Sequence, residues 1–256
     1  MKKCWSFLLV IILVLSVSAL ADSDMKVVSF SDAGLEKEVE GVSFADGVLT
    51  VTSPGEYMLS GKLSNGRLAV DCSEEGKVTL YLNGISIHTD GAAAILIGEC
   101  KPKVVLSLVN GTENTVSNGA QAAPDEDEEP NGVIFSQSDL VIEGSGSLKV
   151  TAASADGIVS KDELVINGGK ITVESKRHGI KGKDCVEIYE SETSVTEISI
   201  TAGRDGIKST NKKDSSRGYV SIRGGSISIN CGDEPIQFVT SCTIENAKIS
   251  FKVNKN

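Results

Sequence analysis

One motif recurs through the C-terminal half of the chain and constrains its fold more than any other feature. Each copy has a short strand of alternating apolar residues, a Gly- or Asn-containing turn, a second alternating strand, and a bend before a final isoleucine. The copies are LVIEGSGSLKVTAASADGI (140–158), LVINGGKITVESKRHGI (164–180), VEIYESETSVTEISITAGRDGI (186–207), VSIRGGSISINCGDEPI (220–236) and the truncated CTIENAKISFKV (242–253). Recurrence of this kind is typical of a solenoid of stacked repeats.

The spacing of the copies favours a parallel β-helix. The last residue of the first strand falls at Ile142, Ile166, Ile188, Ile222 and Ile244. Three of the four steps are 22 to 24 residues, and the longer one contains a polar insertion at 210–217. Many Asn-Gly and Asp-Gly pairs are turn signals, and taken alone they would favour an antiparallel sandwich of hairpins. A period of about 22 residues with three short strands instead predicts one turn of a parallel β-helix per copy.

Upstream segments with the same pattern extend the predicted all-β solenoid to residues 41–256. We expect six or seven turns, which at about 4.8 Å per turn gives a prism roughly 30 Å long. Residues 22–40 are polar and weakly patterned, and we expect them to form a linker or a cap.

Residues 1–21 have the pattern of a secretory signal peptide: two lysines, an apolar run and a small-residue cleavage site. A membrane anchor is the alternative, but the apolar run is short for a span of about 20 residues. We therefore expect a secreted or cell-surface protein. Without Lys2 and Lys3, 23 basic residues face 35 acidic ones, a formal charge of −12. This excess of acidic residues argues against a nucleic-acid partner.

When the turns stack, the residues that precede the bend glycines line up in a column, and most of them are acidic. Carboxylates one turn apart repel each other, and their spacing of about 4.8 Å suits a bridging Ca²⁺ at 2.3–2.6 Å from each oxygen. A second column precedes the first strands. Two alternatives remain: simple turn chemistry, and neutralisation of the second column by Lys161 and Lys183. The candidate calcium ligands are Asp156, Asp205, Asp162, Asp184, Asp233 and Glu234.

His178 interrupts the acidic column and marks a missing or weakened metal site. Arg177 and Arg204 each stand one residue before the column in adjacent turns. We expect these two side chains to emerge together, where they could bind a carboxylate of a ligand. The alternative is a pair of solvated surface arginines. His178, Arg177 and Arg204 are therefore the candidate ligand-binding residues.

The segments LVINGGKITV, GIKGKDCVEI, ITAGRDGIKSTN and GYVSIRGGSISI resemble a clostridial-type carbohydrate-binding family with a right-handed parallel β-helix fold. The resemblance covers about residues 41–256. It implies a secreted or surface protein that binds cellulose and acidic plant polysaccharides, with calcium along the helix and no established catalysis. It also implies that Asp156 and Asp205 are the best calcium ligands, followed by Asp162 and Asp184.

We therefore expect a monomeric, non-catalytic protein that binds acidic polysaccharide such as pectic galacturonan with the help of calcium. Cellulose is kept as a second ligand, although the absence of Trp after residue 21 argues against an aromatic platform. One alternative is a calcium-dependent polysaccharide lyase with Arg177 or Arg204 as its base. The other is a structural surface protein in which calcium serves only stability.

Overall fold

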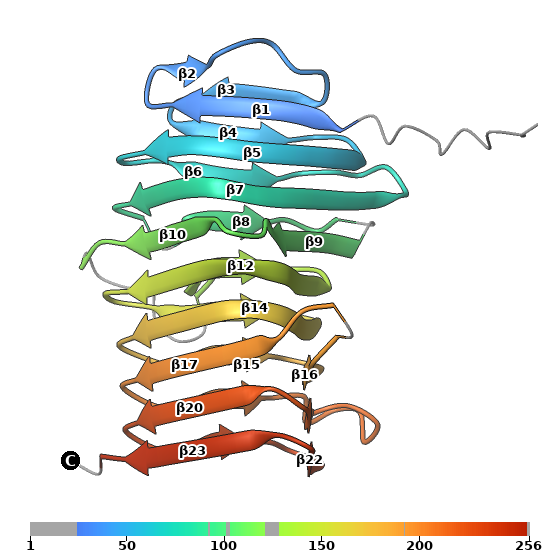
Figure 1. Cartoon of the computed structure of the whole chain (residues 1–256), viewed down its shortest axis with the longest axis vertical. Helices are drawn as coiled ribbons and strands as arrows, with labels where there is room; N and C mark the ends of the chain where they lie inside the picture. Colours follow the sequence, from blue (N-terminus) through green and yellow to red (C-terminus); the bar gives the residue numbers. More distant parts are fainter. Residues whose placement is uncertain (1–24, 92, 101–102, 121–127, 192, 255–256) are drawn as a thin grey trace, which may run out of the picture.

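The computed structural model describes residues 25–91, 93–100, 103–120, 128–191 and 193–254. Over these residues the regular structure is entirely β-strand, and the strands stack into an elongated parallel β-helix (Figure 1). The predicted fold class is confirmed. No helix capable of crossing a membrane occurs in these stretches. The expected signal peptide, 1–21, lies outside the described residues.

Two sheets form the walls of the solenoid. The 14-stranded sheet contains β1 (Lys26–Ser31), β2 (Gly34–Leu35), β5 (Gly55–Leu63), β7 (Lys77–Thr89), β9 (Lys103–Leu108), β10 (Glu113–Asn118), β12 (Leu140–Ala152), β14 (Glu163–Ser175), β16 (Cys185–Tyr189), β17 (Thr196–Ala202), β19 (Tyr219–Arg223), β20 (Ser226–Cys231), β22 (Cys242–Glu245) and β23 (Lys248–Val253). The nine-stranded sheet contains β3 (Val42–Ala45), β4 (Val48–Val51), β6 (Arg67–Val70), β8 (Ile95–Ile97), β11 (Gly132–Ser136), β13 (Asp156–Ser160), β15 (Ile180–Gly182), β18 (Ile207–Ser209) and β21 (Ile236–Gln237).

The larger sheet bends sharply, so that each turn of the helix has three sides. The first half of β12 pairs with β9 and its second half with β10, and the register shifts between Gly144 and Ser147. Gly144 has a φ of +100°, and a Cβ there would lie 2.3 Å from the carbonyl oxygen of Leu108. Only glycine fits at this corner, because any side chain would collide with the backbone of the preceding turn.

The strand register confirms the predicted stacking. Ile142, Ile166, Ile188, Ile222 and Ile244 are successive partners in one column. The isoleucines at the bends form a second column, Ile134, Ile158, Ile180, Ile207 and Ile236. β3 joins the smaller sheet as an antiparallel partner of β4, which leaves eight parallel strands and seven turns between them. The expectation of six or seven turns therefore holds at its upper value.

The interior is filled by the alternating apolar residues, as predicted. Ile166, Ile171, Val173 and Ile180 from the second copy of the motif are all buried in one core that runs the length of the solenoid. Burial of each such side chain stabilises the fold by about 1.5–3 kcal/mol. No single turn could bury its own apolar side chains, so the stack is the smallest stable unit.

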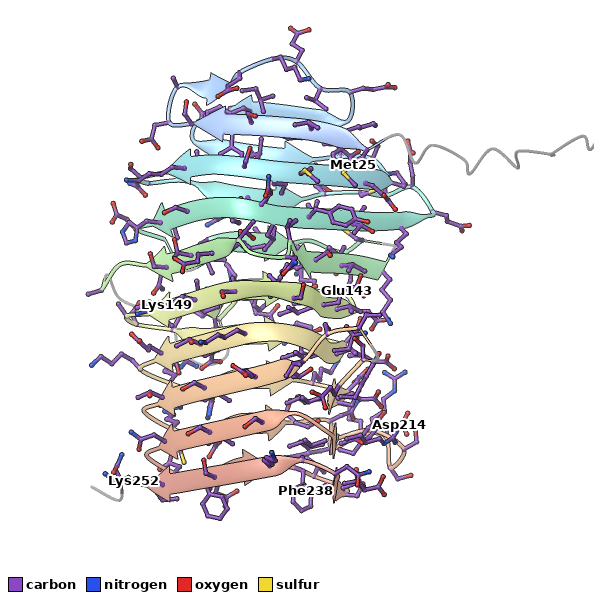
Figure 2. All side chains as sticks on the ribbon, viewed as in Figure 1. Met25, Glu143, Lys149, Asp214, Phe238 and Lys252 are labelled. Atoms are coloured by element: carbon purple, nitrogen blue, oxygen red, sulfur yellow. The ribbon has the colours of Figure 1, made fainter. Side chains whose placement is uncertain are left out.

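The two ends of the solenoid differ. At the N-terminal end, β1 pairs with β5, and β2 and β3 add antiparallel strands there. Residues 22–40, expected to be a linker or a cap, thus contain β1 and β2 of this end. At the C-terminal end, Figure 2 shows Phe238 on the last turn, far from Met25.

Candidate functional site

A groove of about 850 Å³ lies on the outer side of the nine-stranded sheet, toward the C-terminal end. Its walls come from β13, β15, β18, β21 and the segments that follow these strands, together with Glu129, Asn131 and Glu234. Five of its lining residues are lysines: Lys161, Lys181, Lys183, Lys208 and Lys212. Such a concentration of positive charge is unexpected in a chain with a formal charge of −10, so we define these residues as the lysine groove.

Strand alternation and register place four of the lysines in two rows along the solenoid axis. The first row is Lys181 and Lys208, and the second is Lys161 and Lys183. Lys181 follows Ile180 on β15, and Lys208 follows Ile207 on β18, so each isoleucine points inward and each lysine outward. The two lysines are register partners on neighbouring strands. In the second row, the Lys183 amide donates to the Ser160 carbonyl at 2.9 Å, so Lys183 lies one turn beyond Lys161. Successive lysines are therefore about 4.8 Å apart along the axis at their backbones.

Asp156 is fully buried and lies next to Lys181. One of its oxygens is 3.7 Å from Lys181 Nζ, and the other is 3.4 Å from Arg177 Nε. The latter oxygen also accepts the His178 backbone N–H at 3.0 Å. A buried carboxylate is retained only when it is paired and hydrogen-bonded, and Asp156 meets both conditions.

Asp205 lies two positions along the column from Asp156, beyond His178, and it is also paired with a lysine. Its carboxylate lies 3.1 Å from Lys208 Nζ and 3.1 Å from His178 Nδ1, and it accepts the Glu234 backbone N–H at 3.1 Å. Burial raises the pKa of Asp205, but the hydrogen bonds from His178, the Glu234 amide and Lys208 outweigh it and lower the pKa to about 2. Lys208 also lies 3.5 Å from His178 Nε2. Asp205 is therefore ionised and holds Lys208 in position at the groove.

The predicted column of Asp156, His178, Asp205 and Glu234 is real, and its side chains link successive turns. Asp156 and Asp205 each accept a backbone N–H of the next member, and His178 Nδ1 donates to the Asp205 carboxylate at 3.1 Å. Lysines lie against both aspartates, so the repulsion that suggested calcium is already offset. Within the described ranges, no three side chains among His, Cys, Asp and Glu converge to hold a metal ion.

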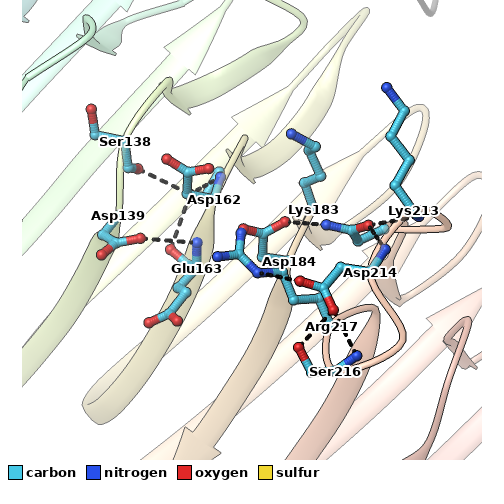
Figure 3. A network of polar contacts seen from close by, with 12 residues as sticks. Ser138, Asp139, Asp162, Glu163, Lys183, Asp184, Lys213, Asp214, Ser216 and Arg217 are labelled. Atoms are coloured by element: carbon cyan, nitrogen blue, oxygen red, sulfur yellow. Dashed lines mark hydrogen bonds and ion pairs between the residues drawn. The ribbon is translucent and has the colours of Figure 1, made fainter.

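The second column is also present, and one of its carboxylates, Asp184, is paired with a residue that was not among the candidates (Figure 3). The Asp184 amide donates to the Asp162 carbonyl at 3.1 Å. The Asp184 side chain is buried and forms an ion pair with Arg217, which comes from the insertion 210–217. Asn211 donates to the same carboxylate at 2.6 Å. The insertion thus contributes the partners of Asp184.

Asp162 is only partly buried. Burial raises the pKa of Asp162, and the carboxylates of Asp184 and Asp139 raise it further, which outweighs the opposite effect of Lys183 and Arg217. Lys161, which was weighed as its neutralising partner, instead pairs with Glu129. Asp162 is therefore the described member of this column whose negative charge is least compensated.

The three candidate ligand-binding residues do not share one surface. The Arg204 amide donates to the Arg177 carbonyl at 3.1 Å, so the two arginines occupy adjacent turns as predicted. The Arg177 side chain is only 11% exposed and points to Asp156, whereas Arg204 is exposed. His178 is buried. Arg204 alone is at the surface, with the exposed Asp233 beside it, whose amide donates to the Arg204 carbonyl at 3.3 Å.

The sequence analysis did not predict the lysine groove, because its candidate residues precede the bend glycines. A usable signal was present two residues after that glycine, in the repeated Gly-Ile-Lys of residues 179–181 and 206–208. Sequence repetition could place these two lysines in register, but it could not show that Lys212, from the insertion, lies beside the same hollow.

Comparisons with known proteins agree with this fold. A family model described as "Carbohydrate-binding domain-containing protein" matches residues 45–256. A protein of the same description from Acetivibrio thermocellus is 35% identical over 234 residues, which cover 91% of this chain and 80% of the relative. A solved structure, "polysaccharide lyase-like protein from C. thermocellum, Gadolinium derivative", superposes with a TM-score of 0.82 at 33% identity, over 90% of this chain and 91% of that one.

Proposed function

Because the chain belongs to the family of carbohydrate-binding domain-containing proteins, we propose that its lysine groove binds an acidic polysaccharide such as pectic galacturonan. The observation that carries the proposal is the gathering of five lysines around one hollow in an otherwise acidic chain. A repeating row of ammonium groups suits a polymer whose carboxylates also repeat.

The electrostatics support binding through several weak contacts. An ammonium and a carboxylate 4 Å apart attract by about 1 kcal/mol in water and by about 4 kcal/mol near a protein surface. An ammonium carries three N–H donors, so a lysine that contacts a carboxylate of the protein can also contact a carboxylate of the ligand. Thr210, which is partly exposed, lines the same groove and supplies a hydroxyl group for a sugar hydroxyl.

This proposal resolves the conflict between an acidic protein and an acidic ligand without requiring a bridging ion. Calcium remains a separate proposal, with Asp162 as the carboxylate that a cation would relieve most. Export from the cell also remains a proposal, and it fits a ligand found outside cells.

We propose binding without catalysis. Arg177 is buried against Asp156 and cannot reach a substrate as a base in this form. Arg204 is exposed, so it is the arginine with which the alternative of a lyase can be tested. A steady rise in absorbance of unsaturated product on polygalacturonate, abolished by Arg204→Ala, would replace the binding proposal with that of a lyase.

The test uses the two exposed lysines of the groove, because Lys181 and Lys208 also neutralise buried carboxylates. Isothermal titration with polygalacturonate compares the wild type with Lys183→Gln/Lys212→Gln. The matched control is Lys149→Gln/Lys170→Gln, which removes the same charge from β12 and β14 on another side of the solenoid. Removing two contacts of about 1 kcal/mol each should weaken binding by roughly 10-fold or more in the groove variant. The control should change affinity less than two-fold.

Two further conditions separate the mechanisms. Higher salt should weaken binding, because exposed charges are screened. A chelator should leave binding intact if the lysines act alone and abolish it if calcium bridges the ligand. Equal losses in the two double variants, or no heat with the wild type, would rule out the groove as the binding site.

A further inference from the structure

The chain contains six Asn-Gly pairs, and their surroundings in the structure differ. They begin at Asn65, Asn83, Asn110, Asn118, Asn131 and Asn167. Asparagine is a chemically labile residue. It is most labile before glycine, because no side chain hinders the glycine nitrogen from attacking the asparagine side-chain amide. The attack needs an asparagine side chain that can turn and a glycine N–H that can lose its proton to water. These two conditions separate the six pairs.

In three pairs the glycine N–H is already held in a hydrogen bond. The Gly66 and Gly119 amides each donate to a backbone carbonyl of a neighbouring turn at 2.8 Å. The Gly84 amide donates to the Asn114 side chain at 2.9 Å. Such an N–H meets water and base only when its hydrogen bond opens, so these three pairs are protected in the folded protein.

Two further pairs are held by their packing. Asn131 is only 3% exposed, and the glycine after it begins β11. The Asn167 side chain donates to the Tyr189 hydroxyl at 3.1 Å. Gly168 lies within β14, where a Cβ would be 2.4 Å from the Gly144 carbonyl oxygen. Neither backbone has room to change its conformation as ring closure requires.

The pair Asn110-Gly111 is different. Both residues are exposed, and they occupy the centre of a turn closed by the Thr112 amide, which donates to the Val109 carbonyl at 3.2 Å. Gly111 has a φ of +74° and Asn110 does not have a positive φ, as in a type II turn. No described residue is hydrogen-bonded to the Asn110 side chain or to the Gly111 N–H. A Cβ on Gly111 would meet no atom within 4 Å beyond its chain neighbours. This pair alone among the six meets both conditions.

We propose that Asn110 is a site of spontaneous deamidation in the folded protein. Water or hydroxide removes the proton of the Gly111 N–H, and the nitrogen forms a bond to Cγ of Asn110. The bond from Cγ to the side-chain nitrogen breaks, and ammonia leaves with a proton taken from solvent. The product is a five-membered succinimide ring.

Hydrolysis of the ring consumes one water and has two possible products. Water that adds at Cγ opens the ring to aspartate. Water that adds at the former peptide carbonyl opens it to isoaspartate, in which the backbone runs through Cβ and Cγ. The two steps together replace an amide by a carboxylate, release one ammonia and need no oxidant, reductant or cofactor.

The isoaspartate form would alter a corner of the solenoid. The turn joins β9 to β10, which pair with the two halves of β12 on either side of the bend in the larger sheet. Adjacent turns approach closely there, since a Cβ on Gly146 would be 2.2 Å from the Val109 carbonyl oxygen. One extra backbone carbon next to Val109 should therefore loosen this corner. The lysine groove lies on the other sheet, so the proposal does not depend on what the groove binds.

Peptide mapping by mass spectrometry, after incubation of the purified chain at mildly alkaline pH, tests the proposal. Cleavage after glutamate separates Asn110 from Asn118, because Glu113 lies between them. In the folded protein Asn110 should convert at least about 10-fold faster than the asparagine of any other pair, because those pairs react only when the structure opens. Enzymatic methyl transfer to the free carboxylate identifies the isoaspartate product. In urea that unfolds the chain, all six pairs should react at similar rates.

Two variants form a matched pair. Asn110→Gln should abolish the modification of this turn, since the longer side chain would have to close a less favourable six-membered ring. Asn83→Gln makes the same change in a protected pair and should leave the conversion of Asn110 unchanged. After the same incubation, the unfolding temperature of the wild type should fall by about 2–4 °C, whereas that of Asn110→Gln should stay constant.

An Asn110 side chain that stays an amide in the folded protein would overturn the proposal. So would another pair that converts as fast as Asn110 before the chain is unfolded. Full conversion with an unchanged unfolding temperature would refute the predicted loosening of the corner.

Discussion

Replacing Asp205 by Asn should make the stability of the solenoid less dependent on acidic pH. Asp205 has a pKa of about 2 in the folded protein, compared with about 3.9 for an ordinary aspartate. The difference corresponds to about 2 kcal/mol of stabilisation by the ionised carboxylate. Because the folded pKa is depressed, this contribution is complete above about pH 4 and is lost as the pH falls toward 2.

Urea denaturation at several pH values between 2 and 7 measures the effect. At pH 7 the Asp205→Asn variant should be about 2 kcal/mol less stable than the wild type, because Lys208 and His178 lose their anionic partner. The two proteins should approach the same stability near pH 2. Asp233→Asn is the control, since Asp233 is exposed and its replacement should cost less than 0.5 kcal/mol.

A constant difference between Asp205→Asn and the wild type over the whole pH range would refute this reasoning. It would mean that the loss comes from altered packing or hydrogen bonding and not from the charge of the carboxylate. An unchanged stability at pH 7 would show that the ion pairs around Asp205 contribute nothing net.

Two other substitutions test the stacking of the turns. Gly179→Ala should destabilise the fold by about 3 kcal/mol in thermal or urea unfolding, because the new Cβ would lie 2.6 Å from the Gly206 carbonyl oxygen; Gly91→Ala, with no atom closer than 3.4 Å, should cost under 1 kcal/mol. Arg217→Ala should cost about 3 kcal/mol by leaving Asp184 buried without its ion-pair partner, whereas Lys213→Ala on the same insertion should be neutral, and equal effects would contradict the assigned role.

The glycines at the bends are required for a reason other than turn geometry. The Asp-Gly pairs are turn signals, and glycine usually serves in turns because it adopts a positive φ. Gly157, Gly179 and Gly206 do not have a positive φ, and a Cβ on any of them would meet a carbonyl oxygen of the next turn at 2.5–2.7 Å. Glycine is needed there because adjacent turns approach closely. Pro235 takes the place of glycine in the last turn, where no described turn follows.

The column of aspartates was also predictable, but its chemistry was not. The repeat placed Asp156, His178 and Asp205 correctly because their distance from the isoleucine that follows is constant. The upstream extension was less accurate. Asn131 is the residue before the upstream bend glycine, but it precedes Ile134 by three residues, whereas Asp156 precedes Ile158 by two, so Gly132 is the partner of Asp156. The upstream loops vary in length, so the sequence alone does not reveal a shift of one residue in the register between two turns.

By itself, the sequence determined the parallel β-helix, its period, its core columns and the order of its acidic column, because strand alternation and a fixed repeat length are local properties of the chain. Only the tertiary structure decided which charges meet. Lys181 pairs with Asp156, and Lys208 pairs with Asp205. Arg217 comes from the insertion and pairs with Asp184, and Lys212 of the same insertion lines the groove. These pairings depend on side-chain direction and on the path of irregular loops, which no periodicity encodes.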